Sequence, residues 1–531
     1  MKKRYLSLFI LPICLTGCNK AIPLVFAPYT NYVEASELRV DSDSDYFYQL
    51  KENKSISYIG GTISTYRDLY NNYKNNRSRM NMVATGERKL LVVPIYFSDS
   101  DISAQERKTI LIQNAFFGEE SHTNYESVAS YFNKSSYGQL KITGEVTPWF
   151  NAGISSNEWK DLSTSYMTAS NILVAKAIDY LKENTLINLN DYDLDEDGYI
   201  DGIYAIYDHP LEKNNGSSIF WAYSYNVKEN EWGYNTTKPY ANQYSWSSID
   251  CIDQGKTASK MNISTTNYLL HETGHIFGLD DYYNTLYLPD ENGIANDYHY
   301  QPTGCFDMMD YNVGDENPFS KYLLNWISPK VLKDNVNTTI DLSSFTKTGE
   351  CILVPTSKYN DTPYDEYLLI EYFTPDGLND VEASFTYYDI NGEKGVFDYI
   401  THHGLRIYHI NASLGYFPKG GNSALICKID DSDAENKIKG KNYCVDFAYT
   451  NTVTDEQAKT TPVLCHLLES SGENTFINGK AANNNTLFKY GDDFGITVFK
   501  DFTFYNGEPL NYTFKVKNIH LDKITIEIKS K

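Results

Sequence analysis

Basic residues are scarce in this sequence. Its 46 Lys and Arg stand against 69 Asp and Glu in 531 residues, which gives a formal net charge of −23. No stretch gathers Lys and Arg into a basic patch, so the charge argues against a nucleic-acid partner and indicates a well-solvated surface. Long apolar runs are also missing. None reaches the ~18 residues that a membrane-spanning helix needs.

Cysteine is scarce as well. Of 8 Cys, the six beyond the N-terminal region lie far apart and lack the spacing of metal-ligand motifs: Cys251, Cys305, Cys351, Cys427, Cys444 and Cys465. An exported location would permit disulfides, but their pairing does not follow from one sequence.

The segment 271–281, His-Glu-Thr-Gly-His-Ile-Phe-Gly-Leu-Asp-Asp, carries most of the chemistry. On a helix, His271 and His275 share one face, so both imidazoles reach one ion, with Glu272 beside them. Gly278 can end the helix in a left-handed conformation and return the chain, which brings the Asp281 carboxylate to the same ion. Three protein ligands, with no Cys nearby to close the fourth position, predict a catalytic zinc site. The alternative is an ordinary surface helix with two solvated histidines.

A second segment, 304–312, predicts a Met turn beneath the metal. Met309, chosen over Met308, would provide a soft apolar floor that fixes the ligand imidazoles. Tyr311 follows two residues later, where its hydroxyl would hydrogen-bond the oxyanion that forms on a substrate carbonyl. The alternative for Tyr311 is ordinary packing, because the chain holds 46 Tyr.

At these motifs the sequence resembles the immune inhibitor A family of secreted bacterial metalloproteases, a zincin group with the motif H-E-x-x-H-x-x-G-x-x-D. The likeness extends to residues 89–94, 130–138, 317–322 and 325–329, and weakly to 366–371 and 404–409. The resemblance implies that His271, His275 and Asp281 hold zinc and that Glu272 is the catalytic base. It does not securely cover Tyr311.

The implied activity is that of a zinc endopeptidase acting on proteins or peptides. Zinc lowers the pKa of bound water from 15.7 to about 7, and Glu272 would take the water proton during attack on the peptide carbonyl. A different class is a surface-anchored adhesin or glycan-binding lipoprotein on a zincin scaffold. The intact Glu272 argues against it, because a binding module needs no base beside the metal.

The acidic loop at 193–201 matches the first half of a calcium-binding loop. Asp193, Asp195 and Asp197 would surround a hard cation, with the Tyr199 carbonyl and Asp201 as further ligands. Tyr204 stands where an EF-hand has its bidentate Glu, so a complete EF-hand is not expected. The alternative is an acidic turn whose Asp residues only cap backbone groups.

The N-terminus indicates export. Lys2, Lys3 and Arg4 precede an apolar run, and Leu-Thr-Gly-Cys at 15–18 has the form of a bacterial lipobox. Residues 1–18 thus resemble a lipoprotein signal peptide that leaves a lipid-bearing Cys18 at the extracytoplasmic membrane face or cell surface. The alternative is a plain secretory signal.

The rest of the chain divides into three parts. Residues 19–85 are polar and predict a tether or pro-segment, in which cleavage at Arg77 or Arg79 would release the protease from its lipid. Residues 86–330 mix strand and helix patterns and predict a domain of mixed α+β structure. The family resemblance implies that this domain is zincin-like and catalytic. Residues 331–531 show short alternating strands, such as Ile524, Ile526 and Ile528, and predict an all-β region like a β-sandwich, with one or two subdomains.

Overall fold

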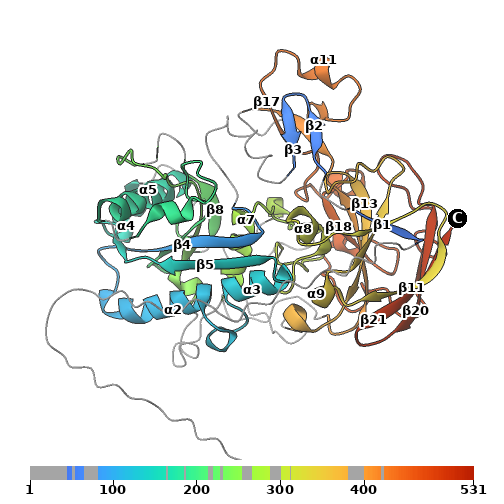
Figure 1. Cartoon of the computed structure of the whole chain (residues 1–531), viewed down its shortest axis with the longest axis horizontal. Helices are drawn as coiled ribbons and strands as arrows, with labels where there is room; N and C mark the ends of the chain where they lie inside the picture. The colour runs from blue at the N-terminus through green and yellow to red at the C-terminus, as the bar shows by residue number, and fades with distance from the viewer. Residues whose placement is uncertain are drawn as a thin grey trace, which may run out of the picture.

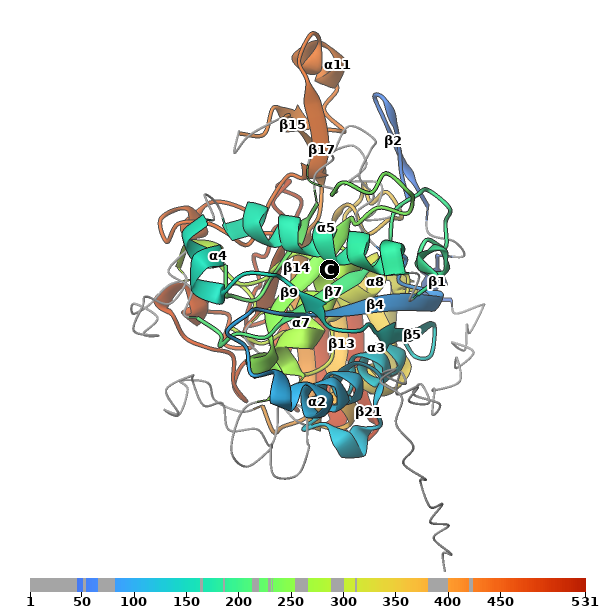
Figure 2. The ribbon, with the colours of Figure 1, turned by 90° about the vertical axis from the view of Figure 1, so that its left-hand side faces the viewer.

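Two lobes make up the molecule, with a small projection beside them (Figures 1 and 2). The computed structural model describes residues 45–50, 54–64, 82–162, 166–184, 187–212, 219–227, 231, 233–253, 266–287, 300–310, 313–380, 400–419 and 424–531. The predicted signal peptide with Cys18 lies outside these residues. Among the described residues, no helix combines the length and apolar character needed to cross a bilayer.

One lobe contains the predicted catalytic domain and is called the catalytic lobe below. It is built on a six-stranded sheet in the order β5-β4-β7-β9-β8, with β6 paired to β4. Its strands are β4 (Gly86–Tyr96), β5 (Leu140–Val146), β6 (Phe150–Asn151), β7 (Ile203–Tyr207), β8 (Tyr223–Asn226) and β9 (Gln243–Ser248). All pairings are parallel except that of β8, which runs antiparallel to β9 at the edge of the sheet. Among the described strands, β8 is thus the last one on this side of the sheet.

Helices cover both faces of this sheet (Figure 2). Along β4, Leu91 and Val93 pack into the core beneath α5, whereas Leu90 and Val92 pack into the core with α2, α3 and α7. Because both faces are covered, β4 is a nearly continuous apolar run, as expected for a parallel strand. The helices of the chain are α2 (Gln105–Phe117), α3 (Val128–Ser135), α4 (Ser156–Leu162), α5 (Tyr166–Asn184), α7 (Asn267–Ile276), α8 (Pro318–Leu323), α9 (Phe345–Thr348) and α11 (Ala434–Ile438).

The C-terminal lobe contains two sheets that share one apolar core. The larger contains β1 (Phe47–Gln49), β10 (Lys330–Leu332), β12 (Cys351–Pro355), β13 (Glu366–Phe373), β14 (Gly404–Asn411) and β18 (Cys465–Leu468). The other contains β11 (Asn337–Ser343), β21 (Lys523–Ser530), β20 (Tyr512–Ile519) and β19 (Asp493–Phe494). These sheets agree with the predicted β-rich C-terminal region, which also contains the short helices α9 and α11. Ile524, Ile526 and Ile528, which alternate in sequence, are all fully buried between the sheets.

The two lobes share a continuous apolar core, which runs from α2, α3 and α7 to the inner face of the larger C-terminal sheet. Hydrogen bonds cross the same boundary. The Tyr125 hydroxyl donates to the Leu378 carbonyl at 2.6 Å, and the Tyr137 hydroxyl donates to the Phe345 carbonyl at 2.7 Å. The catalytic lobe therefore rests on the C-terminal lobe through packed and hydrogen-bonded contacts.

Residues 45–50 and 54–64, which precede the catalytic lobe, form what we call the N-terminal strap. Its strand β1 pairs antiparallel with β10, and Phe47 is buried in the C-terminal core. Its hairpin, β2 (Ile56–Tyr58) and β3 (Gly61–Ile63), reaches the small projecting sheet. There the Tyr443 hydroxyl donates to the Ile59 carbonyl at 2.8 Å, and the Ile59 amide donates to the Tyr416 hydroxyl at 3.1 Å. This projecting sheet contains β16 (Cys427–Lys428), β15 (Leu414–Pro418) and β17 (Tyr443–Phe447).

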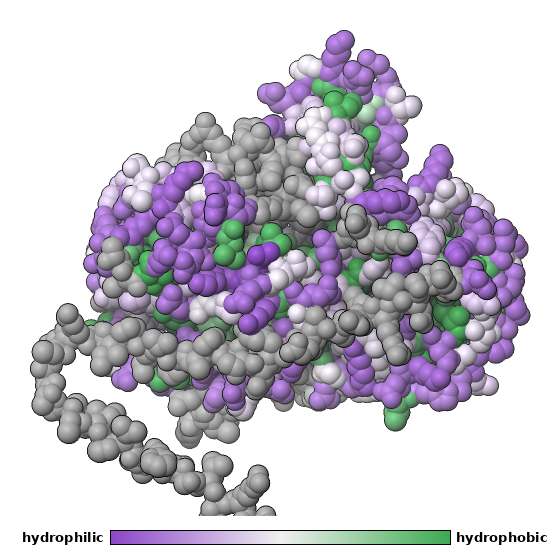
Figure 3. Space-filling view, viewed as in Figure 1, coloured by the Kyte–Doolittle hydropathy of each residue, from purple (hydrophilic) through white to green (hydrophobic). Residues whose placement is uncertain are grey.

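The described surface is mainly polar on the face drawn in Figure 3, where apolar areas are small and separate. This agrees with a chain in which acidic residues far outnumber basic ones. Short 3₁₀ turns link the larger elements: η1 (Ile102–Ala104), η2 (Glu120–His122), η3 (Leu189–Tyr192), η5 (Ile249–Cys251), η6 (Thr285–Tyr287), η7 (Gly377–Asn379), η8 (Gln457–Lys459) and η9 (Thr475–Asn478).

Candidate active site

Helix α7 carries the H-E-x-x-H segment beneath the edge of the catalytic sheet. Its apolar residues Leu269, Leu270 and Ile276 are buried in the core, which leaves His271 and His275 on the opposite face. Gly278 adopts a φ of +93°, a left-handed conformation that side chains other than glycine rarely take. The chain turns back at this glycine, so Asp281 comes to lie over the histidine face.

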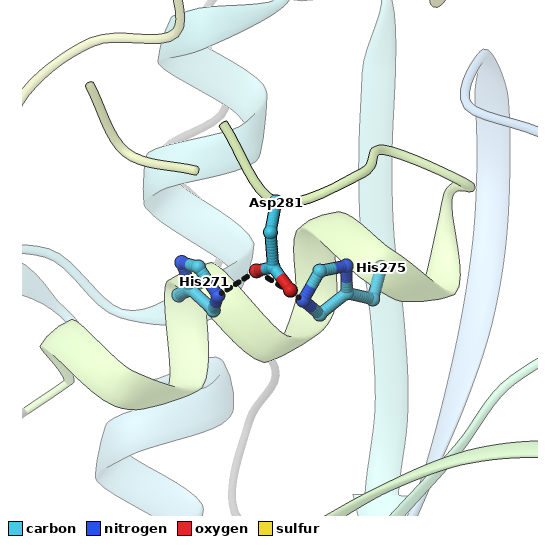
Figure 4. A group of neighbouring side chains, drawn as sticks. All are labelled: His271, His275 and Asp281. Carbon is cyan, nitrogen blue, oxygen red and sulfur yellow. Dashed lines mark hydrogen bonds and ion pairs between the residues drawn. The ribbon is translucent and has the colours of Figure 1, made fainter. Parts of the chain in front are cut away.

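The three predicted ligands meet at one point (Figure 4). Asp281 Oδ1 lies 3.1 Å from His271 Nε2 and 3.3 Å from His275 Nε2. The other ring nitrogens face backbone carbonyls, His271 Nδ1 at 2.9 Å from Met308 O and His275 Nδ1 at 2.7 Å from Leu279 O. A carbonyl only accepts, so each Nδ1 carries a proton, and each Nε2 faces the shared centre. This donor set suits a metal cation.

Strong electrostatic coupling links the three side chains. Burial alone would raise the pKa of Asp281, but His275 and His271 hold it well below its usual range. Burial alone would lower the pKa of His275, yet the Asp281 carboxylate raises it to about 10. In the absence of a cation, the centre therefore holds protons that a metal would displace on binding.

The predicted Met turn lies directly under α7. Met309 is fully buried, and a Cβ at Gly274 of the helix would overlap its sulfur. Asp307 fixes the turn, because its carboxylate accepts hydrogen bonds from the Met309 amide at 2.9 Å and from Asn317 Nδ2 at 2.7 Å. The Met309 carbonyl accepts from the Tyr282 amide at 2.7 Å, which ties the floor to the segment that carries Asp281.

The lobe that carries this centre matches a known peptidase family. Residues 89–299 match the sequence model of the immune inhibitor A peptidase M6 catalytic domain. The catalytic domain belongs to the immune inhibitor A family. The protein is accordingly a metalloendopeptidase. No curated protein sequence matches the chain.

In this immune inhibitor A domain, Glu272 faces the cleft between α7 and the sheet. Its side chain is almost fully buried, and burial is the main cause that raises its pKa. Ser224 Oγ on β8 lies 3.3 Å from Glu272 Oε2. Ser245 Oγ on β9 donates to the Glu272 backbone carbonyl at 2.7 Å. The two strands thus fix the position of the helix and of the carboxylate together.

A cleft with a volume of about 290 Å³ opens over the three ligands and Glu272. Its walls come from β8 with the residues just before it, from the start of β9, and from the segment after α7. Besides His271, Glu272, His275 and Asp281, it is lined by Trp221, Ala222, Tyr223, Ser224, Tyr225, Asn226, Gln243, Leu279, Asp280 and Tyr283. Strand β8 and the predicted metal ligands therefore face the same space.

The acidic loop follows η3 on the same lobe. Asp193, Asp195 and Asp197 bring carboxylate oxygens within 4.8 Å of one another. Asp193 also accepts hydrogen bonds from the amides of Asp197 at 3.0 Å and Gly198 at 2.9 Å, which closes the loop around it. Asp201 Oδ2 accepts from the Leu194 amide at 3.0 Å. Tyr199 lies beside Tyr240 through a parallel β-bridge.

Some site residues were missed by sequence reasoning, and one predicted residue lies outside the structure's described part. Tyr311 falls in the undescribed pair 311–312. Ser224, Gln243, Asn226 and Asp307 were not predicted. The first three reach the cleft only through the pairing of β8 with β9, which leaves no local sequence signal, whereas Asp307 lies two residues before Met309 and was open to inference.

Proposed function

We propose that this metallopeptidase is a zinc-dependent endopeptidase of zincin architecture that acts outside the cytoplasmic membrane. The observation that carries the proposal is the convergence of His271 Nε2, His275 Nε2 and Asp281 Oδ1 in a cleft that also holds Glu272. Two imidazoles and one carboxylate, without thiolates, form the ligand set of a catalytic rather than a structural zinc site.

His271, His275 and Asp281 would hold the zinc, and their Nδ1 hydrogen bonds to Met308 and Leu279 keep both rings in the required orientation. When bound, zinc supplies Lewis acidity, which lowers the pKa of water to about 7 and polarises a carbonyl oxygen. Met309, packed against Gly274, keeps water away from the underside of the ligands.

Glu272 is the proposed base. Its buried carboxylate has a raised pKa, so it accepts a proton from water more readily than an exposed glutamate does. It then donates that proton to the amine that leaves. Ser224, on the sheet edge, orients the carboxylate through its 3.3 Å contact. Tyr311 remains the proposed oxyanion donor on the basis of its place two residues after Met309.

The substrate would bind as an extended strand. Strand β8, the outermost of the described strands on this side of the sheet, borders the cleft, and backbone groups along an edge strand can bind an added chain regardless of its side chains. This geometry favours a protein or peptide substrate.

Two further proposals concern stability and location. The gathered carboxylates of Asp193, Asp195 and Asp197 favour a structural calcium ion in the acidic loop. The lipobox at residues 15–18 favours a lipoprotein that is attached through Cys18 to the extracytoplasmic membrane face.

The test uses residues 19–531, with casein as substrate and bound metal measured by mass spectrometry. We expect one zinc and chelator-sensitive cleavage for the wild type, full zinc with a loss of about 10²- to 10⁴-fold in rate for Glu272→Gln, and loss of both for His275→Ala. Glu106→Gln on the exposed face of α2 is the matched control and should retain full activity. A zinc-loaded Glu272→Gln protein that cleaves casein at the wild-type rate would refute the mechanism.

A further inference from the structure

One end of the active-site cleft presents hydrogen-bond acceptors that lack donors. Gln243 is only 6% exposed, and its Nε2 donates to the His275 carbonyl at 2.5 Å. Its Oε1 is buried and has no hydrogen-bond partner among the described residues. The same holds for Oδ1 of Asn226, the residue that pairs with Gln243 between β8 and β9. Both side chains line the cleft.

A carboxylate also lines the cleft. Asp280 lines the cleft and directly follows Leu279, whose carbonyl holds His275. Among the described residues that line the cleft, none is Lys or Arg. The opposite end is formed by Trp221, Ala222 and Tyr223, where β8 begins. The cleft is therefore polar and acceptor-rich at one end and largely aromatic at the other.

Buried acceptors without donors are costly. Removing a carbonyl oxygen from water without giving it a hydrogen-bond donor costs about 1–3 kcal/mol of free energy. Two such oxygens belong to residues that pair across β8 and β9 and that line the cleft, which indicates that a donor arrives with the ligand. A Lys ammonium brings three N–H donors and an Arg guanidinium brings five, both with the positive charge that Asp280 favours.

We propose that Asn226, Gln243 and Asp280 form a specificity subsite that selects a Lys or Arg side chain of the substrate near the scissile bond. The inference rests on the peptidase function proposed above and adds the chemical class of side chain that the enzyme prefers. Asn226 and Gln243 would each accept one hydrogen bond from the cationic group, and Asp280 would supply the complementary charge.

The experiment uses zinc-loaded residues 19–531 and a peptide library that varies one position at a time around the cleaved bond. We expect one position at which Lys or Arg is cleaved at least about tenfold faster than norleucine, which matches Lys in length but lacks donors. In Asn226→Leu, kcat/KM for the basic peptides should fall more than kcat/KM for norleucine peptides. Asn184→Leu, which replaces an exposed amide on α5, should leave the ratio unchanged.

A binding measurement separates this inference from the proposed function. Glu272→Gln in full-length form is titrated with the same Arg and norleucine peptides, and the Arg peptide should bind more tightly. Cleavage of no peptide at all would count against the proposed function, while the binding preference would still support the subsite. Equal binding and equal cleavage of Arg and norleucine peptides, or a preference that persists in Asn226→Leu, would overturn the subsite.

Discussion

Gly274, between His271 and His275, packs against the buried Met309 beneath the helix. A helix normally gains about 1 kcal/mol when an interior glycine becomes alanine. Here the added Cβ would overlap the buried Met309 sulfur, and overpacking of this kind costs about 1–3 kcal/mol. The contact therefore decides whether alanine at position 274 stabilises or destabilises the protein.

We expect Gly274→Ala to lower the free energy of unfolding, measured by urea denaturation. In a Met309→Ala background the same change should become neutral or stabilising, because the overlapping atom is gone and the helix propensity remains. An equal effect of Gly274→Ala in both backgrounds would show that Met309 does not pack against the helix.

At the scale of elements, the acidic loop connects η3 to β7, a central strand of the catalytic sheet. Calcium bound there would stabilise the lobe, because a ligand at 100 times its Kd adds about 2.7 kcal/mol to the folded state. We expect millimolar Ca²⁺ to raise the melting temperature of the wild type and to have no effect on Asp195→Ala. Asp191→Asn, adjacent to the loop, is the control and should respond like the wild type. A wild type that melts at the same temperature with and without Ca²⁺ would leave the loop as an acidic turn.

The elements also show how far sequence reasoning reaches. The ligand helix was predictable, because His271, Gly278 and Asp281 act within one helix and one turn. The alternation of Ile524, Ile526 and Ile528 likewise follows from the period of a strand. Ser224 and Gln243 were not predictable, because their roles depend on the antiparallel edge pairing of β8 with β9. The pairing of β1 with β10 could not be predicted from the sequence either, because more than 280 residues separate the partners.

On the scale of the whole molecule, the free energy of unfolding depends on pH through a largely buried carboxyl group in the C-terminal lobe. Asp365, just before β13, accepts hydrogen bonds from the amides of Asn360 at 2.7 Å and Glu366 at 2.8 Å. Burial nevertheless raises its pKa to about 6. The folded state thus binds this proton more tightly than the unfolded state, in which an Asp has a pKa of about 3.9.

The raised pKa of Asp365 stabilises the folded state by at most about 3 kcal/mol. This stabilisation is complete below about pH 4 and is lost as the pH rises to about 6. We expect Asp365→Asn to lose this dependence, so the wild type should become less stable relative to the variant between pH 4 and 7. Urea denaturation at several pH values, with chelator present, measures the difference. A wild-type-minus-variant difference that stays constant over this range would contradict the raised pKa.

The N-terminal strap changes what proteolytic processing would accomplish. Its strand completes the edge of the larger C-terminal sheet, with Phe47 and Ile63 buried in two cores. A cut at Arg77 or Arg79 would break the peptide bond but leave the strap bound to the C-terminal lobe. The product would be a two-chain enzyme, and its light chain would carry the lipid proposed at Cys18. Cleavage of the backbone and release of the enzyme from the membrane would then be separate events. Release would require β1 to dissociate from β10.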